Sequence, residues 1–294
     1  MPELPEVETI RRGLEAKLPG HIIEKIEVKL PKLLVNSNLE ELKRALVGGK
    51  FTAVRRLGKI LILESENYSL LVRLGMTGQL TFRDLNLPDS NEFTVHPLTG
   101  LQRALGQFEP DKHTHIILYL DGNTSLCYRD IRQFGKWYLY AKEKLNSSSE
   151  LNSLGPDPFG DDYTIDNLTR GLKKTARAIK TALLDQSIVA GLGNIYADEV
   201  LFASHILPTK SAKSLTNDEI EAIFNVIKPI LQKSIDNRGT TFSDYRDADG
   251  HKGDNASQLK VYGRGGQPCF LCGRELHKEK IGGRSSVYCP HCQH

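Results

Sequence analysis

The chain has 294 residues, more than a single domain usually contains, so two or three compact units are expected. Its formal net charge of +3 is too small to identify a nucleic-acid partner by itself. No run of about eighteen apolar residues and no signal-type apolar segment is present, which argues against membrane insertion and secretion. We therefore expect a cytoplasmic protein.

The first element is predicted to be a helix over residues 6–18. Its apolar residues recur at helical spacing, and Pro19-Gly20 closes the segment. Pro5 is compatible with a first helical turn, where its missing N–H costs nothing. The helix carries Val7, Ile10, Leu14 and Leu18 on its apolar face.

Strand patterns follow the helix as far as about residue 142. Runs such as KILILES, HIILYL and KWYLYA are separated by turn residues, which predicts an antiparallel β-sandwich. Residues 84–112 are rich in Pro, Asn, Asp and Gly and are predicted to form a long mobile insertion.

Helical patterns dominate the second half. One helix is predicted over about 163–185, another from Asn194, and a third over about 216–236. The third opens with the capping box Thr216-x-x-Glu219, and Pro229 is expected to kink it. The expected domains are a β-sandwich at 1–142, a linker at 143–158, a helical domain at 159–258 and a small carboxyl-terminal module at 259–294.

Positive charge is concentrated in two zones. Between residues 170 and 180 there are five cations and no acid. From residue 260 onward the chain contains six cations and two acids. Charge runs are most often solvated surfaces, yet two separate basic zones favour a polyanionic partner. The first zone consists of Arg170, Lys173, Lys174, Arg177 and Lys180.

Four cysteines near the carboxyl end form two C-x2-C pairs, CFLC and CPHC. Four thiolates complete a tetrahedral zinc shell, so the spacing predicts one structural Zn²⁺ ion in a small hairpin module. Two reduced thiol pairs or disulfides are the alternative. The predicted ligands are Cys269, Cys272, Cys289 and Cys292, and Cys127 is predicted to be a small core residue.

The stretch IVAGLGNIYADEV lies between two helical patterns. Gly191 and Gly193 permit tight turns and Asn194 is a good helix N-cap, so free backbone N–H groups would gather where a phosphate could bind. A helix-turn-helix packing corner without a ligand explains the pattern equally well.

Six motifs occur in one order along the chain: MPELPEVET, RLGMTG, DIRQFG, GLGNIYADE, KVYGRGGQPC and the four-cysteine finger. In this respect the chain resembles bacterial formamidopyrimidine-DNA glycosylases. The resemblance implies an α+β fold: an N-terminal helix with an antiparallel β-sandwich, a helix-two-turns-helix domain and a C-terminal zinc-finger hairpin. It implies a monomeric, nucleoid-associated enzyme that excises oxidised purines from damaged double-stranded DNA and cuts the abasic strand by β,δ-elimination.

The resemblance also implies that Pro2 is the nucleophile, once Met1 has been removed. An α-amino group has a pKa of about 8, against about 10.4 for lysine, so far more of it is free base at neutral pH. Glu3 is then the expected general acid at the sugar, and Glu6 is expected to orient the amine or the sugar. Without Pro2, both acids would be ordinary residues favoured by a helix N-terminus.

Further roles are implied by position in the same motifs. Lys59 is expected to assist base release and β-elimination, and Arg284 to act in δ-elimination and phosphate contact. Met76, Arg132 and Phe134 match a trio inserted into the gap left by the extruded nucleotide, where a guanidinium can pair with the orphaned cytosine. Phosphate contacts are expected from His113, Arg132, Lys174, Lys180 and Asn194.

Three departures from the family pattern concern substrate preference: the long 84–112 insertion, Arg73 where histidine is expected, and Ser243 where lysine is common. An endonuclease VIII-type enzyme for oxidised pyrimidines is the alternative, although Leu4 and the Met76 trio favour the purine branch. A zinc-ribbon protein that only binds damaged DNA is a second alternative, but it would need neither a free Pro2 nor Glu3.

Overall fold

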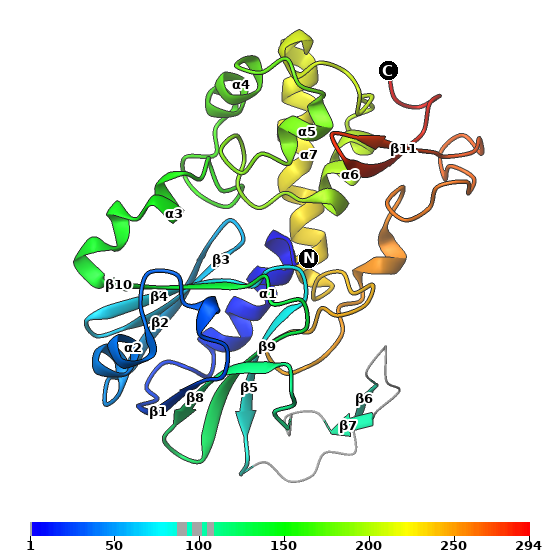
Figure 1. Ribbon diagram of the computed structural model, residues 1–294. Helices are drawn as coiled ribbons and strands as arrows, with labels where there is room; N and C mark the ends of the chain where they lie inside the picture. Colours follow the sequence, from blue (N-terminus) through cyan, green and yellow to red (C-terminus); the bar gives the residue numbers. More distant parts are fainter. Residues whose placement is uncertain (1, 87–92, 96–101, 105–108) are drawn as a thin grey trace. The chain divides into compact units, whose positions relative to one another are not determined.

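The computed structural model describes residues 2–86, 93–95, 102–104 and 109–294 (Figure 1). The chain divides into two compact units, one of residues 1–148 and 237–256, the other of residues 149–236 and 257–294. Most of the predicted 84–112 insertion lies outside the described residues. Within it, β6 (Phe93–Val95) pairs antiparallel with β7 (Gln102–Ala104).

The first unit contains helix α1 and two four-stranded antiparallel sheets, as the sequence predicted. Helix α1 (Leu4–Glu15) begins two residues earlier than expected, with Pro5 in its first turn. A short helix, α2 (Leu39–Leu46), follows β1. One sheet has the order β1 (Ile23–Val28), β8 (Thr114–Leu120), β9 (Thr124–Asp130), β5 (Gly78–Asp84); the other has β10 (Lys136–Ala141), β4 (Tyr68–Arg73), β3 (Ile60–Ser65), β2 (Phe51–Leu57).

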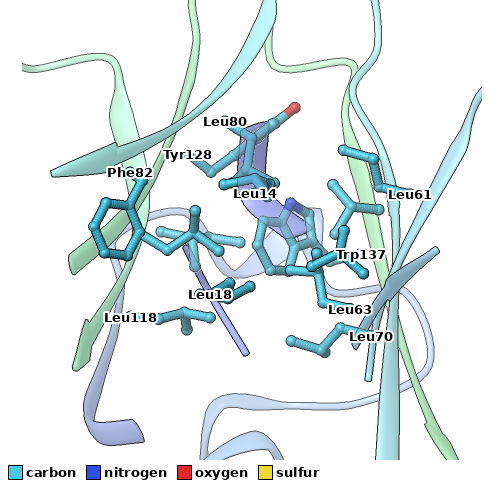
Figure 2. Packing of buried hydrophobic residues seen from close by; sticks show 14 of the residues in the cluster. Leu14, Leu18, Leu61, Leu63, Leu70, Leu80, Phe82, Leu118, Tyr128 and Trp137 are labelled. Carbon is cyan, nitrogen blue, oxygen red and sulfur yellow. The ribbon is translucent and has the colours of Figure 1, made fainter. Parts of the chain in front are cut away.

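The core of this unit lies between the two sheets, and α1 supplies part of it (Figure 2). Leu14 of α1 is fully buried among side chains from both sheets, including Tyr128 and Trp137, whose rings meet edge to face with centroids 5.5 Å apart. Cys127 is fully buried in β9, as predicted for a small core residue. The sheets are therefore held together through the helix that begins at the chain's amino end.

The helix predicted over 163–185 is two helices, α4 (Ile165–Lys173) and α5 (Ile179–Leu183). The Thr175 hydroxyl accepts the Arg177 N–H at 3.3 Å, a local bond that competes with helix continuation. Helix α6 (Asn194–Ala203) begins near Asn194, as predicted, but its N-cap is Gly193, and the Asn194 side chain donates to the Ser285 carbonyl instead. In α7 (Asn217–Asp236), Thr216 and Glu219 form the predicted capping box, and the helix continues through Pro229. The short helix α3 (Ser149–Asn152) lies in the predicted linker.

The zinc-finger region forms the predicted hairpin of β11 (His277–Ile281) and β12 (Arg284–Tyr288). Gly282 and Gly283 connect the strands, both with positive φ, as a two-residue type I′ turn requires. Phe202 at the end of α6 packs with Val261, Leu276 and Val287 beneath the hairpin. The finger thus has a small apolar core shared with a helix.

Residues 237–256 pack with the first unit, whereas the sequence analysis assigned them to the helical domain. The physical reason is a set of contacts with α1 and the sheets: the Thr240 N–H donates to Glu6, and the Phe82 N–H donates to the Ala248 carbonyl. The other expected domain boundaries stay predictions. Among the residues described, no helix combines the length and apolar character needed to span a membrane.

We expect Leu14→Ala to lower the free energy of unfolding by about 2–5 kcal/mol, because it leaves a cavity where α1 meets both sheets. Urea unfolding followed by circular dichroism measures the change. Leu85→Ala is the matched control, since Leu85 is 44% exposed whereas Leu14 is 0% exposed. A Leu14 variant as stable as the Leu85 variant would contradict this account of the core.

Candidate functional site

The amino end of α1 carries the first predicted catalytic group. Pro2 and Glu3 precede the helix, and both are buried. Glu3 is 3% exposed and Glu6 1% exposed. The Glu6 carboxylate accepts the Glu3 backbone N–H at 2.8 Å, so the residue that follows Pro2 is fixed in place by a charge-assisted hydrogen bond.

Glu6 also holds a distant segment of the same unit. Its other carboxylate oxygen accepts the Thr240 N–H at 2.7 Å. Gly239, with φ of 81°, lies so close that a Cβ there would sit 3.0 Å from Glu6 Cγ. The Tyr245 hydroxyl lies 3.3 Å from the Glu6 carbonyl oxygen. These contacts make Glu6 the link between Glu3 and the 239–245 segment.

Lys59 lies in the two-residue turn between β2 and β3, with Gly58 in the left-handed conformation. Arg56, at the end of β2, pairs with Glu8 of α1 at 3.0 Å and so anchors this hairpin on the helix. Burial alone would raise the pKa of Glu8, but hydrogen bonds from Arg11 and Arg12 and the charge of Arg56 hold it below its ordinary value. The Lys59 hairpin is therefore fixed to the helix that follows Pro2.

The predicted inserting trio lies on two loops of the first unit. Met76 is half-buried, whereas Arg132 is exposed and Phe134 is 55% exposed. The Arg132 guanidinium carbon lies 4.9 Å from the centroid of the Phe134 ring. An exposed phenyl ring beside a guanidinium suits insertion between bases better than it suits a core.

His113 lies in the turn immediately before β8 and is half-buried. Burial, together with the charge of Arg129, lowers the pKa of its imidazole. Its backbone N–H donates to Asp111 Oδ1 at 3.0 Å, and its carbonyl accepts the Asp130 N–H at 3.0 Å. Burial and the charge of Arg129 therefore favour the neutral form of the ring.

In the second unit, the structure brings Asn194 and the Arg284 hairpin together. Asn194 Nδ2 donates to the Ser285 carbonyl at 2.8 Å, directly after the exposed Arg284. At the hairpin tip, a Cβ on Gly282 would lie 2.5 Å from Thr181 Oγ1, which shows how closely the turn approaches α5. Lys174 is exposed at the end of α4.

Lys180 differs from its predicted role as a phosphate contact. It is 0% exposed, and its ammonium donates to Asp198 Oδ1 at 2.6 Å and to the Asn194 carbonyl at 2.8 Å. Asp198 Oδ2 accepts the Val287 N–H of β12 at 3.1 Å. Burial raises the pKa of Asp198 to about 6, against the lowering effect of Lys180. A cation with these contacts supports the Asn194 turn and the finger rather than touching solvent.

Glu199, beside Asp198 on α6, was not singled out from the sequence. Its carboxylate accepts three consecutive backbone N–H groups, those of Lys260, Val261 and Tyr262, at 2.8–2.9 Å. A signal was available, because an Asp-Glu pair follows the glycine turn after four residues in GLGNIYADEV, within the helix that begins there. The two acids hold the segments on either side of the first cysteine pair, residues 260–262 and Val287, against α6.

The four cysteines converge as predicted. Their sulfur atoms all lie within 4.8 Å of one another, with Cys269 to Cys292 at 4.0 Å and Cys272 to Cys289 at 3.5 Å. A tetrahedral ZnS₄ centre with bonds of about 2.3 Å has sulfur atoms about 3.8 Å apart, so the cluster fits that ion. The Leu271 N–H points to Cys269 Sγ at 3.4 Å, as in a metal-binding turn.

We expect Lys180→Met to lower the free energy of unfolding by about 3–5 kcal/mol, because it leaves the Asp198 carboxylate buried without its cation. The Asp198 pKa in the folded state would then lie further above its unfolded value. The folded state therefore gains relative stability as the pH falls, and the defect should shrink between about pH 8 and pH 5. Urea unfolding at both pH values measures this.

Asp198→Asn added to Lys180→Met is the control for that experiment. It removes the uncompensated charge, so we expect it to abolish the pH dependence of the defect. A defect that is the same at both pH values in the single variant would contradict the ion-pair account.

Comparison with known protein families covers most of the chain. The family model of the formamidopyrimidine-DNA glycosylase N-terminal domain matches residues 1–137. The model of the formamidopyrimidine-DNA glycosylase H2TH domain matches residues 154–246. A model described as a zinc finger found in FPG and IleRS matches residues 266–294, which include all four clustered cysteines.

Individual relatives match this chain over nearly the full length of both proteins. The chain is 42% identical to the formamidopyrimidine-DNA glycosylase of Pelotomaculum thermopropionicum, covering 100% of this chain and 99% of that protein. It is similar to Lactococcus lactis Fpg in a complex with DNA that contains an abasic site, with a TM-score of 0.85, 34% identity and 99% of each chain covered. A further L. lactis Fpg complex, with DNA that contains an oxidised pyrimidine, gives the same values.

Proposed function

Because the chain belongs to the formamidopyrimidine-DNA glycosylase family, we propose that it excises oxidised purines through a covalent bond to Pro2 and then cleaves the abasic strand. Glycosylase activity on damaged DNA follows from the family. The lyase step and the residue roles are our proposal. The observation that carries them is the fixed position of Glu3 directly after Pro2, held by the buried Glu6 carboxylate.

The proposed reaction begins after removal of Met1, when the Pro2 nitrogen is a free secondary amine. It attacks C1′ of the damaged nucleotide and the base leaves with the glycosidic electron pair. The nitrogen loses its proton to the departing base, and O4′ takes a proton from Glu3 as the sugar ring opens to an iminium ion. The nitrogen then carries no proton to lose, so it remains a cationic electron sink that favours elimination of the 3′ phosphate and then the 5′ phosphate.

Two features of the amino end support this chemistry. The positive end of the α1 dipole disfavours an ammonium ion nearby, so it increases the fraction of free amine. Glu3 is buried beside the proposed nucleophile and can transfer a proton to the opening sugar. We propose that Glu6 acts through Glu3, as a residue that positions the backbone.

The remaining predicted residues are proposed to bind DNA and assist elimination. Lys59 is proposed to help base release, and Arg284 to contact a phosphate and assist the second elimination. Met76, Arg132 and Phe134 fill the space of the extruded nucleotide. Lys174, His113 and Asn194 are proposed phosphate contacts; Lys180 supports the Asn194 turn from behind.

We propose that one zinc ion is held by Cys269, Cys272, Cys289 and Cys292, whose sulfur positions fit it. When bound, the ion would supply folding energy to the finger and no step of the reaction. The hairpin would then present Arg284 to the DNA backbone. A location beside the chromosomal DNA is part of the same proposal, because duplex DNA is the substrate.

Excision of oxidised pyrimidines is a second candidate activity. One observation favours it, since a structure of the related L. lactis Fpg holds DNA that contains an oxidised pyrimidine. Arg73 and Ser243 are the departures that bear on this choice. Arg73 lies at the end of β4 with its guanidinium carbon 5.9 Å from the Tyr138 ring centroid, and exposed Ser243 donates to Asp244 at 2.7 Å.

We expect borohydride to trap a covalent complex between the protein and a duplex that carries 8-oxoguanine opposite cytosine, because reduction fixes the iminium ion. Intact-mass measurement must first establish that Met1 is absent. Pro2→Gly should reduce excision severely while leaving most of the binding affinity, measured by mobility shift. Efficient excision without any trapped complex, by protein with a free Pro2, would refute the covalent mechanism.

A lesion panel in the same assay separates the two candidate activities. Faster excision of 8-oxoguanine and formamidopyrimidine than of oxidised pyrimidines supports the purine assignment. Binding of all lesions with no excision would instead support a protein that only recognises damage.

Elemental analysis is expected to find about one zinc per chain, the stoichiometry of a single four-thiolate site. Removal of the ion with a chelator should abolish DNA binding, because the Arg284 hairpin loses its support. Cys127→Ser is the control, since Cys127 lies in β9 and its loss should leave the zinc content unchanged. DNA affinity that survives complete zinc removal would contradict the finger assignment.

A further inference from the structure

Asp130 is a buried acid to which neither the sequence motifs nor the proposed mechanism gave a role. It is the last residue of β9 and is 0% exposed. A buried carboxylate is costly unless several donors compensate its charge, so its partners show what it is for.

The donors to Asp130 come from both loops that carry the inserting trio. Oδ1 accepts the Thr77 hydroxyl at 2.6 Å, one residue after Met76. The same oxygen accepts the Arg132 N–H at 3.2 Å, and Oδ2 accepts the Gly135 N–H at 2.9 Å, one residue after Phe134. The carboxylate is thus bonded to Arg132 itself and to the immediate neighbours of Met76 and Phe134.

Thr77 and Tyr128 complete the connection between the loops. Thr77 Oγ1 accepts the Arg132 N–H at 3.0 Å while donating its own proton to Asp130. The Tyr128 hydroxyl lies 2.8 Å from the Leu74 carbonyl oxygen and 3.1 Å from Asp130 Oδ2. Each loop is therefore tied to the carboxylate by at least one side chain or backbone donor.

The two loops are also in direct backbone contact. Gly75 has φ of 75°, and a Cβ there would lie 2.8 Å from the Gly135 nitrogen. A Cβ on Gly135 would lie 1.7 Å from the Tyr128 hydroxyl oxygen. Gln133, between Arg132 and Phe134, has φ of 58°, a conformation that costs a non-glycine residue energy unless its surroundings impose it. The loops have one arrangement, and Asp130 lies at its centre.

We propose that Asp130 is a positioning residue that fixes Met76, Arg132 and Phe134 as one rigid unit, and that this rigidity is what makes nucleotide extrusion efficient. The inference rests on the proposed function, in which these three side chains occupy the opened duplex. We call these three side chains the wedge. Because the wedge is already ordered before it contacts DNA, it loses little conformational entropy on insertion. It also holds the Arg132 guanidinium where the orphaned base can be read.

Asp130→Asn tests the proposal with little change in volume. The amide group keeps one acceptor oxygen, but its NH₂ cannot accept the Gly135 N–H, so the Phe134 loop loses its anchor. Thr77→Val is a second variant, which removes the hydroxyl bridge between Asp130 and the Arg132 N–H. Asp157→Asn is the matched control, because Asp157 is also buried and accepts a backbone N–H, that of Phe159 at 2.9 Å, in the other unit.

Two substrates separate positioning from catalysis. An 8-oxoguanine:C duplex requires extrusion, whereas a single strand with a preformed abasic site requires none. We expect Asp130→Asn and Thr77→Val to slow single-turnover excision from the duplex by about 10-fold to 100-fold, since misplacement by about 1 Å has effects of that size. Cleavage of the single strand should stay within about twofold of the unchanged protein, because Pro2 chemistry needs no wedge.

A fluorescent base analogue beside the lesion gives a readout that simple loss of stability would not alter. Its unstacking signal should be slower in both variants and unchanged in Asp157→Asn. The preference for cytosine over adenine opposite the lesion should also fall, because Arg132 is displaced. The double variant should be no slower than the slower single variant, since both changes break one network.

Several results would overturn the proposal. Equal losses on the duplex and on the single strand would show a general defect. Unchanged excision in both variants would show that the wedge needs no such anchor, and losses as large in Asp157→Asn would show an effect of stability alone. If the unchanged protein fails to cleave the abasic single strand, the proposed lyase function fails instead, which the unstacking signal distinguishes from failure of the wedge proposal.

Discussion

Buried carboxylates that accept backbone N–H groups hold the irregular segments of this chain in place. Glu6 accepts from Glu3 and Thr240, and Glu199 accepts from three consecutive residues before the finger. Asp130 accepts from Arg132 and Gly135. Loop amides have no ladder or helix to satisfy them, so a buried carboxyl group both pairs them and holds the loop in place. Glu3 and the loops of Met76, Arg132 and Phe134, which are proposed to act on DNA, are held in this way.

This arrangement suits an enzyme whose substrate must be distorted. Extrusion of a nucleotide costs energy, and a protein can supply that energy only through contacts that form in the opened duplex. Side chains that are already ordered lose less entropy on contact than mobile ones. Glu6, Asp130 and Glu199 lie in regular helices and strands, and they hold loops that carry several of the groups proposed to contact DNA.

Local sequence patterns were sufficient to predict the elements that depend on residues close together in the chain. The capping box at Thr216 and Glu219, the hairpin between the cysteine pairs and the buried face of α1 all depend on residues a few positions apart. Likewise, the predicted metal ligands form one cluster because each C-x2-C pair folds within a single turn. The motif order identified the family from the sequence alone.

Long-range pairing could not be predicted. Lys180 belongs to a basic run, and nothing in that run shows that its ammonium meets a buried acid on the next helix. The helix expected over 163–185 ends early because Thr175 bonds to the nearby backbone. The placement of residues 237–256 depends on Glu6, more than two hundred positions away. Hydrophobic periodicity predicts local secondary structure and does not indicate contacts between distant residues.

Residues 237–256 belong to the first unit although they follow most of the second unit in the sequence. The polypeptide passes between the two units at three points, so neither unit is a continuous stretch of sequence. A gene fragment that encodes only the amino-terminal half would omit the partner of Glu6. A cut between residues 148 and 149 would therefore separate residues 237–256 from the unit with which they pack.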